Sequence, residues 1–381
     1  MTHPNRLPAP TLRDVAEAAG VHTATASRAL NPKTRQQISA ETARRVMRAA
    51  QALGYQPNSA ARSLKTSRSS TVGLVIPDLT NPLFPPIVRG VESVLESDGY
   101  NVWIVNTDND EDRERAKIES LRSRQVEGLI IATAQLEHPL LRRLHEQGVT
   151  MVLINRQVEN LSVPAVTGDD ATGVAAAVRH LAGLGHTRIA HLSGPLSTST
   201  GRVRSQAFRH AVRDLGLPGD LTVECGHWSE ADGAAAMRAL LARTTDFTAV
   251  VAGNDLIALG CYDVFAERGL SCPDDVSVIG FNDMPFLDKL RPPLTTVAVP
   301  HHELGAEAAR MLLACIDEPD RPARSVLLPA SLMVRGSTAA PRTPRRAGSV
   351  PGGTRGTGTA RVPGNSAATM PAAGGRPHTR Q

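Results

Sequence analysis

The chain is most constrained by the alternation of apolar runs with helical segments between Thr71 and Asn282. Runs such as TVGLVI, GLII and AVVA are continuously apolar, which is typical of strands buried on both faces of a sheet. We expect strands at 71–78, 101–107, 128–133, 150–155, 188–194, 249–253 and 276–282, and helices at 86–98, 111–124, 138–147, 170–184, 201–215, 230–243 and 255–268. The pattern predicts an α/β fold of doubly wound parallel sheets, and a length of about 265 residues predicts two lobes.

A short all-α segment precedes this body. Thr11 and Asp14 form the pattern of a helix cap, Gly20 suits a tight turn, and Ser39 and Gly54 bound a third helix. Three short helices with a Gly-containing turn between the first two are typical of a helix-turn-helix head. A three-helix module that binds another protein is the alternative on spacing alone.

Charge divides the chain in the same way. Residues 1–70 carry a net charge of +8, residues 71–336 carry −10, and residues 337–381 carry +7. A basic head on an acidic body is typical of a nucleic-acid-binding module joined to a second domain, although a solvated basic surface gives the same count. We expect residues 1–10 and the Gly/Pro/Arg-rich segment 337–381 to be disordered, with the tail either adding nonspecific DNA affinity or being dispensable.

The second predicted helix has the chemistry of a DNA reader. Arg28 can bond the O6/N7 edge of guanine, and Ala24 can lie against a thymine methyl. Thr23 lies at the N-terminal end of the helix, which meets base edges in this motif. The short polar side chains of Thr25, Ser27 and Asn31 suit phosphate contacts.

The head closely resembles the LacI/GalR family of bacterial transcriptional regulators, and the resemblance extends from residue 11 to about residue 336. It rests on the run T-L-x-D-V-A-x-x-A-G-V-x-x-x-T-x-S-R-x-L-N from Thr11 and on the later GYQPNSAARSL. The resemblance implies a helix-turn-helix domain at 11–57, a hinge helix and linker at 58–70, and an effector-binding and dimerisation domain at 71–336. It matches Thr23, Ala24 and Arg28 to base-reading positions.

The resemblance also implies a hinge helix that folds in the minor groove when two protomers pair on an operator. Leu64 would then be the wedge at a central CpG step. The remaining predicted hinge contacts to the groove and backbone are Asn58, Ala61, Arg62 and Lys65.

The head departs from the family pattern in three places. His22 replaces the usual Ser cap of the second helix, and Ala26 replaces a larger core residue. The connector from Asn31 to Ile38 is two residues longer than in the shortest family members. We expect the first two changes to weaken the head without removing a base-reading side chain.

The body has polar residues directly after its predicted strands, where two-lobed α/β proteins bind small molecules. It resembles the family's effector domain, which is similar to periplasmic sugar-binding proteins. The resemblance places eight residues at sugar-contacting positions: Asn81, Phe84, Asn155, Arg156, Arg204, Trp228, Asn254 and Asn282. Aromatic rings suit the apolar face of a sugar, and Arg and Asn suit its hydroxyls.

Asn155 and Asn282 stand where many sugar-binding relatives carry Asp, while Arg156 and Arg204 remain. A carboxylate- or phosphate-bearing effector would fit that change, unless Asp255 or Asp283 restores the charge balance.

Other classes of function fit less well. The chain has no G-x-G-x-x-G after a strand, no Walker motif and no nucleophile elbow, so we expect neither an enzyme nor a cofactor. Three clustered histidines, His180, His186 and His191, could bind a metal, but we expect them to have structural or surface roles instead. The four cysteines are too widely spaced for a zinc site. With no secretory signal and no long apolar run, we expect a cytoplasmic protein without a membrane span. The body alone would also suit a transport-type binding protein, but the attached DNA-reading head and the missing secretory signal argue against that function. The sequence therefore predicts an effector-controlled repressor that binds near-palindromic double-stranded DNA as a homodimer.

Overall fold

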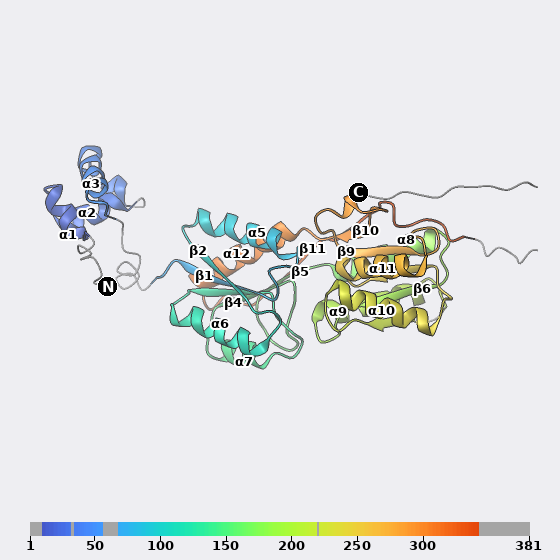
Figure 1. Cartoon of the computed structure of the whole chain (residues 1–381). Coiled ribbons are helices and arrows are strands. Elements are labelled where there is room, and N and C mark those ends of the chain that lie inside the picture. The colour runs from blue at the N-terminus through green and yellow to red at the C-terminus, as the bar shows by residue number, and fades with distance from the viewer. Residues whose placement is uncertain (1–9, 32–33, 56–67, 219–220, 343–381) are drawn as a thin grey trace, which may run out of the picture. The chain divides into compact units, whose positions relative to one another are not determined.

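The computed structural model describes residues 10–31, 34–55, 68–218 and 221–342. The head consists of α1 (Leu12–Ala18), α2 (Thr23–Leu30), the 3-10 turn η1 (Arg35–Gln37) and α3 (Ala40–Leu53) (Figure 1). Thr11 and Asp14 cap α1 reciprocally, through side-chain bonds to each other's backbone N–H. Gly20 lies in the turn with a φ of 61°, a conformation that glycine adopts without strain. Small apolar side chains from all three helices, Ala26 among them, form one core.

The first lobe of the body is built on a parallel six-stranded sheet in the order β11-β5-β4-β3-β1-β2. Its strands are β1 (Thr71–Ile76), β2 (Asn101–Asn106), β3 (Gly128–Ile131), β4 (Met151–Ile154), β5 (Ala165–Gly168) and β11 (Ser325–Leu328). Its helices are α5 (Phe84–Ser97), α6 (Glu111–Ser123), α7 (Pro139–Glu146) and α12 (His301–Asp317). Every residue of β1 is buried, because α5 and α12 cover one face of the sheet and α6 and α7 the other (Figure 1).

The second lobe repeats this architecture in the order β12-β10-β9-β8-β6-β7. Its strands are β6 (Ile189–Ser193), β7 (Leu221–Glu224), β8 (Ala249–Ala252), β9 (Ser277–Asn282), β10 (Thr295–Ala298) and β12 (Ser331–Met333). Its helices are α8 (Asp170–Gly183), α9 (Ser199–Asp214), α10 (Glu230–Arg243), α11 (Asp255–Arg268) and the 3-10 turn η2 (Leu287–Lys289). α8 packs on α9, and α10 packs on α11.

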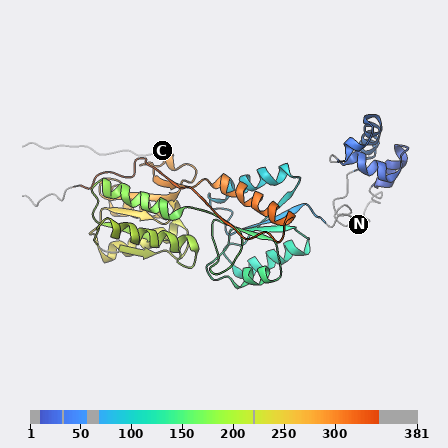
Figure 2. The same ribbon diagram turned by 180° about the vertical axis from the view of Figure 1, so that it is seen from behind.

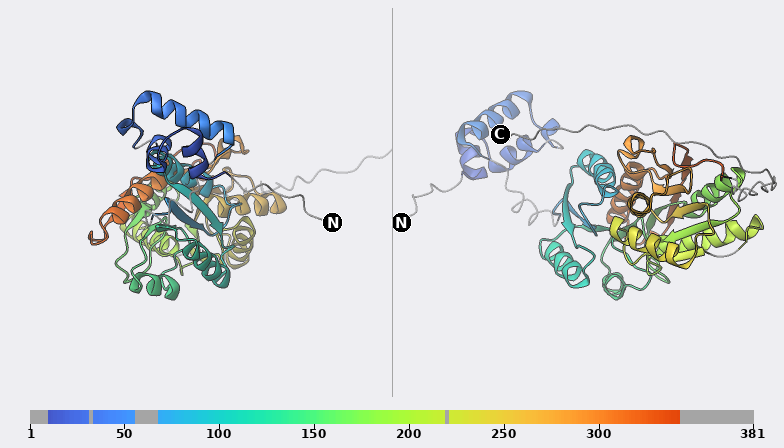
Figure 3. Two further views of the ribbon diagram at one scale, coloured as in Figure 1. Left: turned by 90° about the vertical axis from the view of Figure 1, so that its left-hand side faces the viewer. Right: turned by 45° about the vertical axis from the view of Figure 1, so that its right-hand side comes forward.

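The chain passes between the two sheets after β5, after β10 and after β11. The crossing after β10 brings α12 back to the first lobe, where it packs beside α5 although the two are far apart in sequence (Figures 2 and 3). The doubly wound α/β fold is therefore confirmed, with one exception to parallel pairing: β12 runs antiparallel to β10 at the sheet edge.

The prediction of disorder from Ser337 is wrong for residues 337–342. The Ser337 hydroxyl donates to the carbonyl of Val278 at 2.6 Å and accepts from the backbone N–H of Thr295 at 2.8 Å. Arg342 forms ion pairs with Asp274 and Asp275. This segment lacks large apolar side chains, and polar bonds to the second sheet hold it instead.

Candidate functional site

The first candidate site is the exposed face of α2 in the head. Thr23, Ala24 and Arg28 are exposed, while Thr25 and Ser27 are half-buried. Ala26 and Ala29 on the opposite face are buried. The described head therefore places the predicted base-reading side chains on one accessible surface, at the N-terminal end and middle of the helix after the turn.

The side chain of His22 caps α2, and that this cap is weaker than a Ser cap stays a prediction. Its Nδ1 accepts the backbone N–H of Ala24 at 3.2 Å, which is the role that a Ser oxygen plays at this position. A neutral ring whose proton is on Nε2 supplies this acceptor.

The connector after α2 is tied to the end of that helix. The Arg35 Nε donates to the carbonyl of Ala29 at 3.0 Å, and the Thr34 hydroxyl donates to the carbonyl of Arg28 at 3.1 Å. These bonds satisfy carbonyls that the last turn of a helix leaves unpaired. Asn31 begins this connector and is half-buried. The predicted hinge contacts at Asn58, Ala61, Arg62, Leu64 and Lys65 lie outside the described residues.

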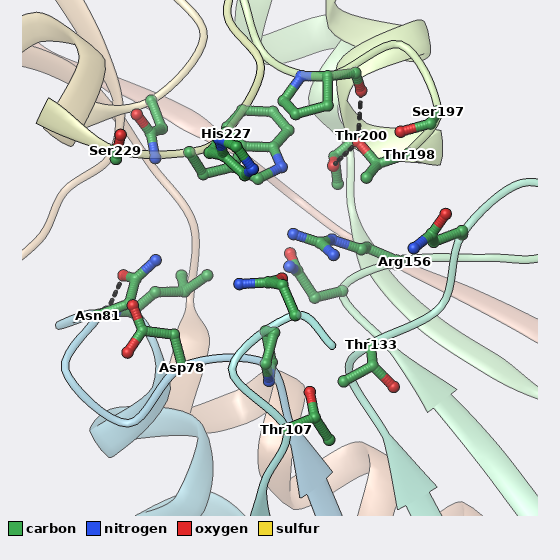
Figure 4. A pocket seen from close by; sticks show the side chains of 18 of the residues that line it. Asp78, Asn81, Thr107, Thr133, Arg156, Ser197, Thr198, Thr200, His227 and Ser229 are labelled. Carbon is green, nitrogen blue, oxygen red and sulfur yellow. Dashed lines mark hydrogen bonds between the residues drawn. The ribbon is translucent and has the colours of Figure 1, made fainter. Parts of the chain in front are cut away.

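The second candidate site is a cavity of about 280 Å³ whose lining comes from both lobes of the body (Figure 4). Its wall is built largely from residues that directly follow strands, as expected at the carboxyl ends of parallel sheets. All eight predicted effector contacts line it: Asn81, Phe84, Asn155, Arg156, Arg204, Trp228, Asn254 and Asn282. That they bind a ligand stays a prediction.

Two of these asparagines adopt an unusual backbone. Asn155 follows β4 with a φ of 66°, and Asn282 ends β9 with a φ of 116°. Few residues other than Gly occupy this region, and Asn and Asp do so most readily. Each side chain is thereby turned off the end of its strand and lines the cavity.

Arg204 is held rigidly by the protein. Its Nε and Nη2 donate to the two oxygens of Asp170 at 3.0 and 3.2 Å, and its Nη1 donates to the carbonyl of Gly253 at 2.7 Å. The guanidinium lies 3.7 Å from the ring centre of Phe281 and 5.5 Å from that of Trp228. Burial raises the pKa of Asp170, and the adjacent guanidinium opposes that rise.

Arg156 is buried without such partners. Its side chain points into the cavity (Figure 4), and its Nε makes no hydrogen bond to any described residue. Burial and the positive charge of Arg204 together lower the pKa of Arg156 to about 10, while Glu114 opposes the change. The guanidinium remains a cation at neutral pH.

The sequence prediction missed several cavity residues. Asp78, Thr107 and Thr133 follow β1, β2 and β3, so the strand-end rule used for the asparagines also applies to them. Glu114 had no such signal, because it lies in the first turn of a largely exposed helix. It is 5% exposed, accepts the hydroxyl of Thr133 and lies 3.3 Å from the Nε2 of His138.

The three clustered histidines bond to the protein. His180 bonds Thr338, and His186 bonds both the Thr248 hydroxyl and the Ala339 carbonyl. His191 bonds the Val251 carbonyl and stacks on Phe208. Two of these rings thus hold the segment after Ser337.

Among the helices of the described residues, none is long and apolar enough to span a membrane.

Comparison with known proteins gives two family matches. Residues 11–58 match the model of bacterial regulatory proteins of the lacI family, and residues 69–335 match that of periplasmic binding proteins and the sugar-binding domain of the LacI family. The ribose operon repressor of Halalkalibacterium halodurans is 34% identical over 86% of this chain and 97% of its own.

Solved structures agree with these matches. A lac repressor dimer bound to operator and the anti-inducer ONPF has a TM-score of 0.77 and 28% identity, over 87% of this chain and 99% of its own. The complex of the transcriptional regulator CelR with cellobiose has a TM-score of 0.67 and 32% identity, over 86% and 99% of the two chains. These relatives regulate transcription and are not enzymes. The chain, with its helix-turn-helix head and its sugar-binding-type body, belongs to the LacI family of bacterial transcriptional regulators.

Proposed function

We propose that this regulator is a cytoplasmic repressor that binds a two-fold symmetric operator as a homodimer and changes its operator affinity when a carbohydrate-type ligand fills the cavity. The main observation in support is that one chain contains both an accessible α2 surface and a cavity lined by both lobes. A ligand that contacts both lobes favours one arrangement of them over another. Such a preference is what coupling between ligand and operator requires.

The α2 surface supports sequence-specific reading of the major groove. Arg28 offers two parallel N–H donors for guanine, worth about 1–3 kcal/mol of discrimination at its base pair. Thr23 and Ala24 lie one helical turn away on the same exposed surface. The predicted minor-groove wedge at Leu64 would add a central CpG step between the two half-sites.

The cavity supports a small polar ligand with an apolar face. Phe84 and Trp228 line it from different lobes and supply ring surfaces suited to the C–H face of a sugar. The asparagine and arginine side chains supply hydrogen bonds for its oxygens. A similar solved structure is the complex of the transcriptional regulator CelR with cellobiose.

Exposed apolar side chains support association with a second copy. Trp103 and Ile104 are exposed on β2, a strand at the edge of the first sheet, and Phe286 in the second lobe is 77% exposed. Exposed apolar side chains that gather into a continuous patch often mark a protein–protein interface. The dimer bound to operator in the lac repressor structure is the model for that pairing.

The experiment is to select bound duplexes from a random DNA pool with the purified full chain and to sequence them. We expect a near-palindromic site with a central CpG. The variant Arg28→Ala should lose roughly thirtyfold or more in affinity for that site, because each half-site loses a contact worth about 1–3 kcal/mol. It should also lose preference at one base pair of each half-site. Arg115→Ala removes the same charge from the exposed body helix α6 and serves as the control. No enriched sequence at low salt, with and without candidate sugars, would contradict the proposal.

A further inference from the structure

The hydrogen-bond donors of the cavity wall are largely unused by the protein itself. No acceptor in the described part of the chain bonds the Nε of Arg156, although this side chain is 7% exposed. The indole Nε1–H of Trp228 is likewise buried, without an acceptor among the described residues. A buried donor without an acceptor costs about 1–3 kcal/mol, so both groups favour a ligand that supplies one.

Two cavity asparagines add donors of fixed orientation. The Oδ1 of Asn81 accepts the backbone N–H of Leu83 at 3.0 Å, and the Oδ1 of Asn254 accepts that of Ile257 at 2.8 Å. These bonds identify the oxygen end of each amide, because a backbone N–H needs an acceptor. The NH₂ end of each is left for other partners.

Two carboxylates of the wall, those of Glu114 and Asp78, already accept hydrogens from the protein. Glu114 takes the hydroxyl of Thr133 on one oxygen and faces the Nε2 of His138 with the other. The Nδ1 of His138 is within 3.3 Å of the backbone N–H of Gln135, so the ring proton is on Nε2 and is directed at the carboxylate. Asp78 turns back on its own loop and accepts the backbone N–H and the hydroxyl of Thr80.

The charged groups of the cavity wall also favour a ligand that supplies acceptors. Asp170 neutralises Arg204 through two hydrogen bonds, whereas no carboxylate of the described chain lies within ion-pair distance of Arg156. The strand-end positions 155 and 282 carry neutral amides. The lining also contains the carboxylates of Glu111 and Glu114, but Arg156 forms no ion pair with any described residue, and a ligand anion would give it charge-assisted, bidentate bonds.

We propose that the ligand of this cavity is a carbohydrate derivative that carries a carboxylate or phosphate group, bound by the guanidinium of Arg156. This inference rests on the proposed function and specifies its ligand class. Neutral hydroxyl groups would satisfy single donors, but they would leave the buried cation without a counter-charge.

The test is calorimetric titration of the full chain with matched compounds at constant ionic strength. Glucose, glucuronate and glucose 6-phosphate form one series, and ribose and ribose 5-phosphate form another. We expect an anionic member to bind at least roughly tenfold more tightly than its neutral parent, a difference of about 1.4 kcal/mol. Glucuronate against glucose 6-phosphate separates the carboxylate from the phosphate as the recognised group.

Three variants assign the preference to Arg156. Arg156→Gln keeps amide donors without the charge, and it should reduce the anionic-to-neutral affinity ratio to about threefold or less. Arg156→Lys should keep part of the ratio, because it retains the charge but not the planar fork. Arg202→Gln changes an arginine of α9 that pairs with Glu159 and is not among the lining residues, and it should leave the ratio unchanged.

A measurement without ligand guards against a folding defect. Removing an unpaired buried charge should leave the urea midpoint of Arg156→Gln equal to or above that of the wild type. A clearly lower midpoint would show that Arg156 has a partner within the protein, and it would overturn the proposal.

The titrations also separate this inference from the proposed function. If a neutral sugar binds as tightly as its anionic relatives and shifts operator affinity, the ligand class is wrong and the repressor function stands. If no compound of either series binds at millimolar concentration and none shifts operator affinity, both are contradicted.

Discussion

Arg204 on α9 donates to both carboxylate oxygens of Asp170 on α8, at 3.0 and 3.2 Å, and the pair is almost entirely buried. Taking two charges out of water is costly, so such a pair contributes little net stability by itself. Its effect is geometric: it holds the guanidinium plane 3.7 Å from the centre of the Phe281 ring and fixes which N–H groups remain for the cavity.

Removing the Asp170 carboxylate should therefore lower the free energy of unfolding by far more than the small net contribution of the intact ion pair implies. Asp170→Asn leaves the Arg204 cation buried without a counter-charge, and we expect it to lower the free energy of unfolding by about 3–5 kcal/mol. Urea unfolding measures this. The control is Asp246→Asn, whose exposed carboxylate pairs with Arg188 and should matter by less than about 1 kcal/mol. Equal losses in the two variants would contradict the argument.

Gly194 sets the position of the Trp228 ring. A Cβ atom at residue 194 would lie 2.2 Å from the nearest atom of that ring, so Gly194→Ala must displace the indole. We expect ligand affinity to fall by roughly tenfold or more, because a displaced indole would no longer contact the ligand in the correct geometry. Calorimetry checks the affinity, and tryptophan emission checks the displacement, since Trp103 is the one other tryptophan in the sequence.

The control for this change is Gly183→Ala. A Cβ at residue 183 meets no described atom within 4 Å, so neither emission nor affinity should change. Unaltered affinity in Gly194→Ala as well would show that Trp228 does not contact the ligand.

Elements with a strong local pattern were predictable from the sequence, and the elements that depend on distant partners were not. The buried runs at β1, β3, β4, β8 and β9 predicted their strands within two residues. Five other strands were not predictable: unlike the equally short β3, β4 and β8, they are not buried along their whole length, and they lie at or near sheet edges. They are β5, β7, β10, β11 and β12. Such strands acquire their conformation from the neighbour they pair with, and periodicity does not reveal that neighbour.

The same distinction applies to α12, which the sequence analysis also did not identify, and to the cavity. Residues just after fully buried strands, such as Asn155 after β4 and Asn254 after β8, were predictable because topology alone brings strand ends together. Glu114 was not, since its burial depends on the hydroxyl of Thr133 and the ring of His138 reaching it from another segment. Ser337 was assigned to the tail for the same reason: its polar bonds to Val278 and Thr295 leave no apolar signal.

The cap at His22 should carry measurable stability of the head. His22→Ala removes the acceptor for the Ala24 N–H, and we expect a loss of about 0.5–2 kcal/mol in the opening free energy of α2. Hydrogen exchange at the amides of α2 in the full chain measures it. His22→Ser restores an oxygen acceptor and should match or exceed the wild-type protection. If Ala and Ser behave alike, the bond at 3.2 Å contributes nothing.

His301 at the start of α12 should make folding sensitive to acid. Burial, together with the positive charge of Arg204, lowers the pKa of His301 to about 4. The unfolded state, with an ordinary histidine pKa near 6.5, therefore binds more protons than the folded state between about pH 4 and 6.5. Stability from this group is present above pH 6.5 and is lost as the pH falls through that window, by up to about 1.4 kcal/mol per pH unit.

The variant His301→Gln cannot take up this proton. Its unfolding free energy, measured in urea at intervals from pH 7 to pH 4.5, should fall less steeply than that of the wild type, and the difference between the two curves should grow steadily toward acid. His302→Gln changes the exposed neighbour on the same helix and should follow the wild-type curve. Parallel curves for His301→Gln and the wild type would show that His301 accepts its proton in the folded chain as readily as in the unfolded one.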